Sequence, residues 1–451
     1  MSEDREWNPL ELAKKSETFC ILPWVHQYIG PPGDVKPCCV YKHDESLGSL
    51  KENTLKEIWN NDTTKQLRLD MLNGVRRPEC ARCNDREHLQ MAFKNDFNDK
   101  YFKSNINHHV VASTEPDGEV ENHRLLYMDV RFNNLCNFGC RTCSPHFSTS
   151  LIVDHRKLYR KTEKQDKDDG FQFPGKTEGQ AYEEMLPHLP YLKEIYFAGG
   201  EPMMQKEHYM ILEKLIEIGN TDVTIRYNTN FSKLTLNKWD VIEYWKKFKR
   251  VIVNASLDAS HEKGEYWRKG TDWAETVANR ERMIKECPHV TFNISSTVAW
   301  PNVHNVLDFH KEWTEKGLIK VDDVLLNELD GPIYFSLKNL PDWKKKKIEK
   351  AVLEHIQWCK DQNAYRGTIF KLEAVIGFMY TDINRTIEEF PSEQFHWIVS
   401  RLDYIRKESF FDVFPEHKDI EEYLKEKGFE FGPDVFPETN IDFSVRLRHY
   451  G

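Results

Sequence analysis

Three cysteines stand close together in the run NNLCNFGCRTCSPHFS, where three and then two residues separate Cys136, Cys140 and Cys143. Closely spaced thiolates on one loop can bind three irons of a [4Fe–4S] cluster, and the fourth iron then has no protein ligand. That iron is open to a substrate or cofactor. The other interpretation is a zinc site, but zinc normally takes four ligands and only His146 lies nearby as a fourth. The spacing therefore favours an iron–sulfur cluster with one open iron.

A second group of cysteines lies upstream of these three. It consists of Cys20, the adjacent pair Cys38 and Cys39, and the pair Cys80 and Cys83, which two residues separate. Four cysteines that include a C-x2-C pair are typical of structural zinc sites, and they can equally hold an iron–sulfur cluster. Four protein ligands would close either site, so this group predicts electron transfer or structural support.

Composition sets the context for these thiols. The N-terminal stretch MSEDREWNPLELAKK is charged and lacks the apolar core of a signal peptide, so we expect a cytoplasmic protein. Thiols remain reduced there, and clustered cysteines then indicate metal binding or catalysis. The net charge of −10 argues against nucleic acid as a partner, and no apolar run is long enough for a membrane span. Two isolated cysteines, Cys287 and Cys359, are expected to be small buried hydrophobic residues.

Strands and helices alternate from residue 124 onward. Helical crossovers between strands imply parallel pairing in right-handed βαβ units, and six units predict a partial (β/α)6 TIM-like barrel of the α/β class. The cysteine triplet then follows the first strand, at the carboxyl end where such barrels place their chemistry. The expected strands are Leu126–Phe132, Glu194–Ala198, Val223–Asn228, Val251–Leu257, Thr291–Val298 and Val321–Leu326.

The barrel is flanked by two other regions. We expect a small cysteine-rich domain over residues 1–103, a polar linker over 104–123, the barrel over 124–335 and a mostly helical C-terminal region over 336–451. Within the first region, Thr54-Leu55-Lys56-Glu57 has the pattern of a helix capping box. In the last region, Trp343–Gln362 and Gln394–Arg406 have helical periodicity.

Polar and glycine residues follow the later strands. The second strand runs into Gly199-Gly200-Glu201, where two glycines permit close approach to the backbone. Asn228 ends the third strand, and the fourth continues into the Ser256-Leu257-Asp258 segment, with Arg268 beyond it. An arginine can pair with a carboxylate in a bidentate manner.

The C-x3-C-x2-C loop after the first strand resembles the signature of the radical S-adenosylmethionine (SAM) superfamily. Thr142 departs from the aromatic residue often found before the last cysteine. The resemblance implies that Cys136, Cys140 and Cys143 hold the catalytic [4Fe–4S] cluster, with SAM at its open iron. It further implies that the cofactor-binding residues are Gly199, Gly200, Glu201, Asn228, Ser256, Asp258 and Arg268.

The upstream cysteines resemble the SPASM/twitch module of the same superfamily, which carries an auxiliary [4Fe–4S] cluster. The flanking Leu47-Gly48 and Glu57-Ile58-Trp59 segments contribute to the likeness. The resemblance implies Cys20, Cys38, Cys80 and Cys83 as ligands, with Cys38 preferred to Cys39 because it follows Pro37. The module usually follows the barrel, whereas here it precedes it, and a zinc site stays the alternative.

The family resemblance also implies an activity. Reductive cleavage of SAM gives a 5′-deoxyadenosyl radical that abstracts a hydrogen atom from a substrate, with electrons from a flavodoxin- or ferredoxin-type protein. Enzymes with this module often act on peptides or proteins, which we expect as the substrate. The alternatives are a small molecule such as a sugar, nucleoside or cofactor precursor, or a non-catalytic iron–sulfur or zinc scaffold.

Overall fold

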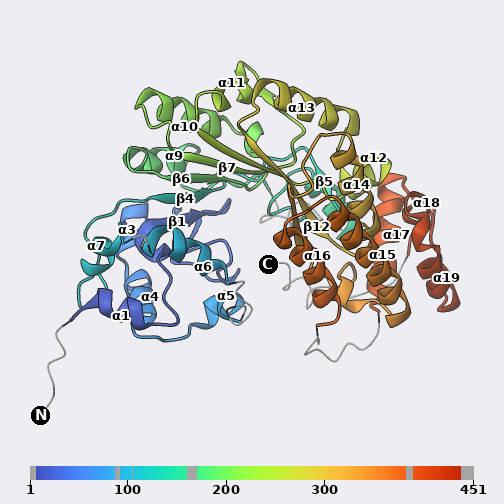
Figure 1. Ribbon diagram of the computed structural model, residues 1–451, viewed down its shortest axis with the longest axis horizontal. Helices are drawn as coiled ribbons and strands as arrows, with labels where there is room; N and C mark the ends of the chain where they lie inside the picture. Colours follow the sequence, from blue (N-terminus) through green and yellow to red (C-terminus); the bar gives the residue numbers. More distant parts are fainter. Residues whose placement is uncertain are drawn as a thin grey trace, which may run out of the picture.

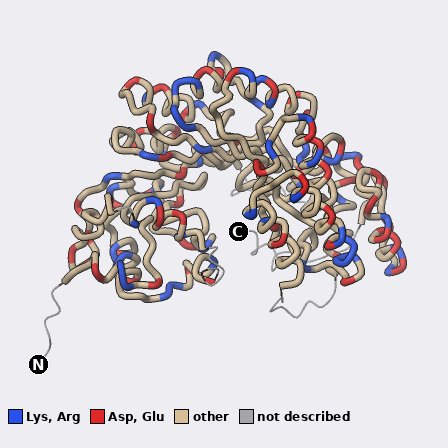
Figure 2. The backbone as a smooth tube through the Cα atoms, in the orientation of Figure 1, with Lys and Arg blue, Asp and Glu red and all other residues tan. Residues whose placement is uncertain are grey.

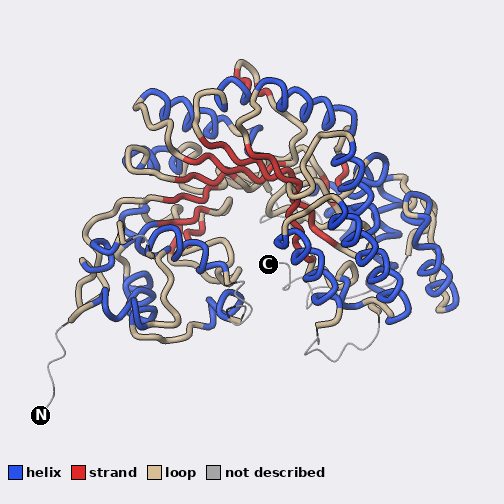
Figure 3. The backbone as a smooth tube through the Cα atoms, viewed as in Figure 1, coloured by secondary structure: helices blue, strands red, loops and turns tan. Residues whose placement is uncertain are grey.

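The computed structural model describes residues 7–85, 87, 92–103, 105–159, 170–381 and 390–437. One curved sheet runs through the molecule, with helices along its outer side (Figures 1 and 3). The strand order in that sheet is β13-β12-β10-β7-β6-β4-β1-β2-β3. All neighbours from β13 to β1 pair in parallel, and β2 and β3 continue the sheet in the antiparallel sense.

The six predicted barrel strands are all present, so the expected α/β partial barrel is confirmed. The first two, Tyr127–Val130 and Glu194–Phe197, are buried at almost every position, as parallel strands covered on both faces require. The last strand begins later than the predicted Val321, because Lys320 and Asp323 close a turn through two hydrogen bonds before it. The strands are β4 (Tyr127–Val130), β6 (Glu194–Phe197), β7 (Thr224–Thr229), β10 (Arg250–Ala255), β12 (Thr291–Val298) and β13 (Val324–Glu328).

Helices connect successive strands and cover the outer side of the sheet (Figure 3). Several begin at a side-chain cap, such as Asp272, whose carboxylate accepts a hydrogen bond from the Glu275 amide. The connecting helices are α8 (Leu151–Tyr159), α9 (Gln180–Met185), α10 (Lys206–Glu217), α11 (Val241–Trp245), α12 (His261–Trp267), α13 (Trp273–Glu286) and α14 (Val303–Glu315). Two small ribbons accompany them, β5 (Gly139–Cys140) with β11 (Arg268–Lys269), and β8 (Thr235–Leu236) with β9 (Trp239–Asp240).

The N-terminal region extends the barrel sheet rather than forming a sheet of its own. Strand β1 (His26–Ile29) pairs in parallel with β4, and β2 (Asp34–Lys36) and β3 (Gly48–Ser49) follow at the edge. The Thr54–Glu57 capping box is present. The helices here are α1 (Pro9–Lys15), α2 (Leu22–Val25), α3 (Leu55–Trp59), α4 (Asp62–Leu72), α5 (Ala81–Asn84), α6 (Phe93–Phe97) and α7 (His108–Ala112).

The segment 104–123, predicted as a linker, is packed against this region in its described part. Val111 and Val120 are fully buried, and the indole N–H groups of Trp7 and Trp59 donate hydrogen bonds to the carbonyl oxygens of Thr114 and Val120. Its polar composition suggested a free connection, but these apolar residues point inward. One hydrophobic cluster therefore runs from the N-terminal region into the barrel.

The C-terminal region is helical, as expected, and lies at the other end of the sheet (Figure 1). Its residues build a second hydrophobic cluster with the last barrel strands. No helix in the described ranges has the length and apolar character needed to span a bilayer. Basic and acidic residues alternate along the outer helices (Figure 2). The helices are α15 (Asp342–Asp361), α16 (Arg366–Met379), α17 (Ser392–Arg406), α18 (Phe410–Val413) and α19 (Lys418–Glu426).

Candidate active site

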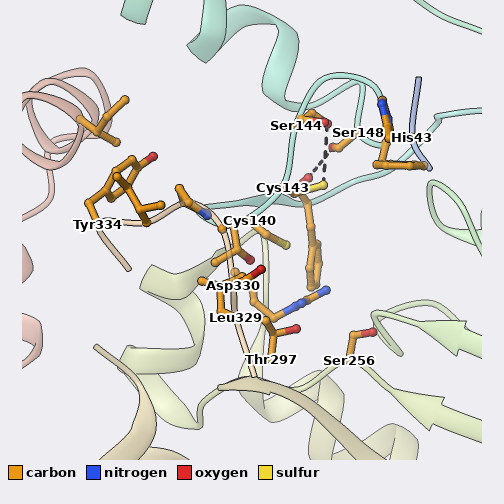
Figure 4. A pocket seen from close by; sticks show the side chains of 18 of the residues that line it. His43, Cys140, Cys143, Ser144, Ser148, Ser256, Thr297, Leu329, Asp330 and Tyr334 are labelled. Carbon is orange, nitrogen blue, oxygen red and sulfur yellow. Dashed lines mark hydrogen bonds between the residues drawn. The ribbon is translucent and has the colours of Figure 1, made fainter. Parts of the chain in front are cut away.

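The three cysteines lie on a loop at the carboxyl end of β4. Hydrogen bonds within the loop fix its path. The Ser148 hydroxyl donates to the Phe138 carbonyl at 2.6 Å, and the Ser150 hydroxyl donates to the Cys136 carbonyl at 2.7 Å. Figure 4 shows Cys140 and Cys143 beside Ser144 and Ser148 at one side of a pocket. The thiols therefore sit on a shaped loop rather than on a free turn.

A short ribbon joins this loop to the segment that contains Arg268. In the β5–β11 pair, Arg268 lies opposite Cys140 and Lys269 lies opposite Gly139. Gly270 follows with φ +107, and a Cβ there would come within 2.7 Å of the Asn137 carbonyl oxygen. The close approach of the two backbones explains why this position is glycine. As a result, Arg268 is held next to the cysteines although 127 residues separate it from Cys140.

The glycine pair after β6 packs directly against the residues that precede Cys136. The Glu201 amide donates to the Leu135 carbonyl at 2.7 Å, and the Gly200 amide donates to the Asn133 carbonyl at 3.3 Å. A Cβ on Gly200 would lie 2.1 Å from the Leu135 oxygen, well inside van der Waals contact. The two segments can thus meet only because residue 200 has no side chain.

Glu201 turns its carboxylate into the protein, where it is 1% exposed. It accepts hydrogen bonds from the Thr229 hydroxyl at 2.6 Å, the Asn230 amide at 2.7 Å and the Met203 amide at 3.1 Å. Burial raises the pKa of Glu201 to about 7, against the opposing effect of these donors. The carboxylate fastens the glycine segment to the end of β7.

Arg268 is oriented by Asp258, which follows β10. Its Nη1 donates to Asp258 Oδ2 at 2.8 Å, and the other oxygen of that buried carboxylate accepts the Thr297 amide at 2.7 Å. Arg268 Nε is buried and has no hydrogen-bond partner among the described residues. Arg268 lines the cavity, and Asp258 holds its guanidinium in place.

Burial dominates the electrostatics of the thiols. It raises the pKa of Cys136 and of Cys143 to about 12, and neighbouring thiols add to both shifts. It also raises the pKa of Cys140, where the nearby Arg268 opposes the shift. Metal ligation requires thiolates, so binding of iron at these residues would have to displace protons.

Helix α17 and the residues after it hold the cysteine loop from outside. Arg141 donates from Nη2 to Asp403 at 2.6 Å and to Glu408 at 2.7 Å, and its guanidinium lies 3.7 Å from the Tyr266 ring centroid. Arg406 donates to the Gly139 carbonyl at 2.7 Å. The sequence did not predict these contacts between α17 and the cysteine loop. The one signal for them was Arg141, a charged residue between the predicted ligands Cys140 and Cys143.

The upstream cysteines also gather, but one of the five faces elsewhere. Burial raises the pKa of Cys38 well above its usual range, and the neighbouring thiols of Cys39, Cys20 and Cys80 add to the shift. Cys80 and Cys83 interact in the same way. Cys39 is exposed and lies beside Asp129 and Arg131. Cys20, Cys38, Cys80 and Cys83 thus lie near one another, and their assignment as the ligand set stays a prediction.

A cavity of about 1740 Å³ joins these features. Its wall contains residues from all three regions of the chain, including Arg82, Tyr334 and Gln394. Figure 4 shows Ser256 and Thr297 at strand ends, and Leu329, Asp330 and Tyr334 on the loop after β13. Of the predicted site residues, those that line the cavity are Cys136, Cys140, Cys143, Gly199, Gly200, Glu201, Asn228, Ser256 and Arg268.

Comparison with known families matches two parts of the chain. Residues 130–302 match the profile described as the radical SAM superfamily, and residues 20–84 match SPASM, an iron–sulfur cluster-binding domain. The chain contains a radical SAM domain and a SPASM domain. Its SPASM domain precedes the radical SAM domain, as the sequence indicated.

Solved structures show remote similarity. The anSMEcpe structure with bound AdoMet is 19% identical, covering 52% of this chain and 62% of that chain, with a TM-score of 0.38. SuiB of Streptococcus suis is 14% identical, and the match covers 61% of this chain and 56% of SuiB, with a TM-score of 0.34. The chain therefore spans about three fifths of the length of these proteins. No curated protein matches it.

The radical SAM and SPASM domains imply a [4Fe–4S] cluster, SAM and an auxiliary iron–sulfur cluster, and the residues present fit these groups. A loop with three thiols suits a cluster with an open iron. Arg268 and the Gly199–Gly200 segment lie at the same cavity wall. A guanidinium suits a carboxylate such as that of SAM.

Proposed function

We propose that this chain cleaves SAM reductively at a [4Fe–4S] cluster held by Cys136, Cys140 and Cys143, and abstracts a hydrogen atom from a peptide or protein. The observation that carries the proposal is that one cavity is lined by these thiols, the Gly199–Gly200 backbone and Arg268. The thiol loop follows β4, and the glycine pair follows β6. Such a cavity can hold a cofactor and a substrate side by side.

Each group has a distinct role in the proposed site. When bound, the cluster and SAM supply the electron and the 5′-deoxyadenosyl radical, which are the cofactor's own chemistry. Arg268 would bind the SAM carboxylate, with Asp258 as a positioning residue. The Gly199–Gly200 carbonyls would accept from the SAM ammonium. Glu201 would position that segment, and its charge would favour the ammonium.

Ser256 and Asn228 are proposed to contact the remainder of SAM, since both line the cavity at the ends of β10 and β7. Residues Cys20, Cys38, Cys80 and Cys83 are proposed to bind the auxiliary cluster. Electrons would come from a flavodoxin- or ferredoxin-type protein. The cavity walls would keep water from the reacting carbon, which such chemistry requires.

Cavity size favours a large substrate. Sites for small ligands enclose about 300–1,000 Å³, whereas this cavity of about 1740 Å³ draws its wall from three regions of the chain. Space for a chain segment remains after SAM is accommodated. The SPASM module, common in peptide-modifying members, points to the same class.

The first experiment tests SAM cleavage. The protein is reconstituted anaerobically with iron and sulfide, reduced with dithionite and given SAM, and methionine and 5′-deoxyadenosine are quantified. We expect both products, and a Cys140→Ala variant should form neither. Cys287→Ala, which removes a buried cysteine remote from the cavity, serves as the matched control. Product levels that are equal in wild type and Cys140→Ala would refute the activity.

The second experiment tests the substrate class. The active holoenzyme is incubated with SAM and a deuterium-labelled lysate separated into macromolecular and small-molecule fractions. Deuterium in 5′-deoxyadenosine reports hydrogen abstraction from the substrate. We expect transfer from the macromolecular fraction, abolished by prior protease treatment. Transfer from the small-molecule fraction alone would refute a peptide substrate and favour a small molecule.

A further inference from the structure

Two histidines and a cysteine meet between α14 and α15, on the opposite side of the barrel from the cavity. His310 comes from α14, and His355 and Cys359 come from adjacent turns of α15. All three are at most 2% exposed, and none lines the cavity. They lie near Val321, which precedes β13, whereas the cavity lies at the carboxyl ends of the strands.

The ligand atoms of the three side chains converge. His310 Nδ1 lies 2.9 Å from His355 Nε2, and one ligand atom from each of the three residues lies within 4.8 Å of the others. In a tetrahedral zinc site, nitrogen and sulfur ligands at their usual bond lengths of about 2.0–2.3 Å are roughly 3.3–3.6 Å apart. The observed spacing needs only a small adjustment to admit one ion.

The surroundings resemble the outer shell of a metal site. The second nitrogen of His310, Nε2, donates to the Val321 carbonyl at 2.9 Å, which leaves Nδ1 with a free lone pair directed at His355. Ligating histidines are usually oriented in this way. The Trp358 ring stacks on His355 with centroids 5.1 Å apart and contacts His310 edge-on at 5.5 Å. Both imidazoles are thus held in place.

A buried hydrogen bond between two histidines explains this arrangement less well. In that case Cys359 would be only an apolar filler. An ion bound by both imidazoles and the thiol would give all three side chains a common role.

Charge balance also favours a divalent cation. A thiolate supplies one negative charge. Asp322 lies near enough to act electrostatically on both His310 and Cys359. The hydrogen bonds that Asp322 accepts from the Tyr365 amide and the Thr368 hydroxyl both reach Oδ1. Its carboxylate is therefore held near the site, where it offsets part of the ion's second charge.

We propose that His310, His355 and Cys359 form a structural zinc site that fastens the C-terminal helices to the barrel. Mixed cysteine and histidine ligands at these distances are typical of Zn²⁺. Water would complete the tetrahedron. The ion would join α14, the last barrel crossover, to α15, the first helix of the C-terminal region.

The test measures zinc in the full-length holoenzyme. The protein is produced with zinc present, reconstituted anaerobically and washed with a chelator, and zinc and iron are counted per chain. Zinc-edge X-ray absorption then gives the ligand atoms. We expect about one tightly held zinc with one sulfur and at least two nitrogen ligands, in line with a closed structural site.

Variants locate the ion. Cys359→Ala and His355→Gln should lose the zinc and keep the iron, because iron retention reports that the fold and clusters survive. Cys287→Ala should keep both metals. Cys80→Ala is the control for the upstream cysteines and should lose iron but not zinc. None of these counts depends on SAM cleavage, so failure here is distinct from failure of the proposed function.

Two results would overturn the site. One is wild-type holoenzyme that contains no zinc after the wash. The other is zinc with four sulfur ligands that disappears in Cys80→Ala and persists in Cys359→Ala, which would place the ion at the upstream cysteines.

Discussion

Replacement of Gly200 by alanine should disable the catalytic site while leaving the rest of the protein intact. The new Cβ would lie 2.1 Å from the Leu135 oxygen and 2.8 Å from the Asn134 carbonyl carbon. Ordinary contact begins at 3.4 Å, so the two backbones must separate by more than 1 Å. No side chain can move aside, because the obstructing atoms belong to the backbone that leads into Cys136.

The magnitude follows from two costs. Overpacking of a tight contact typically costs about 1–3 kcal/mol, and each backbone hydrogen bond lost between the segments costs about 0.5–1.5 kcal/mol. We therefore expect about 2–5 kcal/mol of local destabilisation. A displacement of about 1 Å at a reacting centre can reduce the rate about 10²-fold.

The assay compares 5′-deoxyadenosine formation and iron content in Gly200→Ala and in Gly377→Ala. Gly377 lies in α16, where a Cβ would meet nothing within 4 Å, so alanine there should be neutral or slightly stabilising. We expect Gly200→Ala to lose at least about 10²-fold in rate and to keep the iron of the upstream cysteines. A rate within a few-fold of wild type would refute the steric reasoning.

Three further predictions concern the cysteine sites and their support. Cys38→Ala should lower the iron content from about eight to about four per chain, whereas Cys39→Ala should leave it unchanged, as measured by iron and sulfide analysis. Loss of iron in Cys39→Ala alone would show that Cys39 is the ligand. Arg268→Lys should raise the SAM concentration needed for half-maximal rate by about tenfold or more, since lysine cannot pair with a carboxylate in a bidentate manner. Lys269→Arg is the control, and the same SAM dependence in both variants would contradict a contact between Arg268 and the SAM carboxylate. Asp403→Ala leaves Glu408 as the one carboxylate paired with Arg141 among the described residues, and it should destabilise the holoenzyme by about 3 kcal/mol, measured as a lower melting temperature. The control Glu275→Ala should change the stability by less than about 1 kcal/mol. Similar melting temperatures of the two variants would argue against a stabilising role of the Arg141–Asp403 pair.

Patterns among residues close in sequence predicted much of the secondary structure. Six barrel strands, the Thr54–Glu57 cap and the long C-terminal helices were predictable, because each depends on neighbouring residues and on apolar periodicity. The cysteine spacing and the Gly-Gly-Glu segment were also visible, since each is complete within a few residues. These features share one property, namely that the residues which define them are close in sequence.

Pairing across the chain was not predictable. Strand β1 joins β4 in parallel, although the sequence suggested a separate domain and a linker. The sequence of a four-residue buried strand such as β1 does not indicate which strand it pairs with. Packing in the folded protein decides its partner. The role of Glu201 differs for a similar reason, because its three donors come from backbone and side chains that only the fold brings together.

By itself, then, the sequence determined the barrel and predicted an iron–sulfur cluster at its thiols, because spacing on one loop limits what three cysteines can bind. Tertiary structure alone decided what surrounds them. It placed Arg268 opposite Cys140, braced the loop with Arg141 and Arg406, and turned Cys359 from an isolated cysteine into a neighbour of two histidines. These contacts join residues far apart in the chain, and long-range contacts form only when burial of the whole core offsets the entropy of bringing them together.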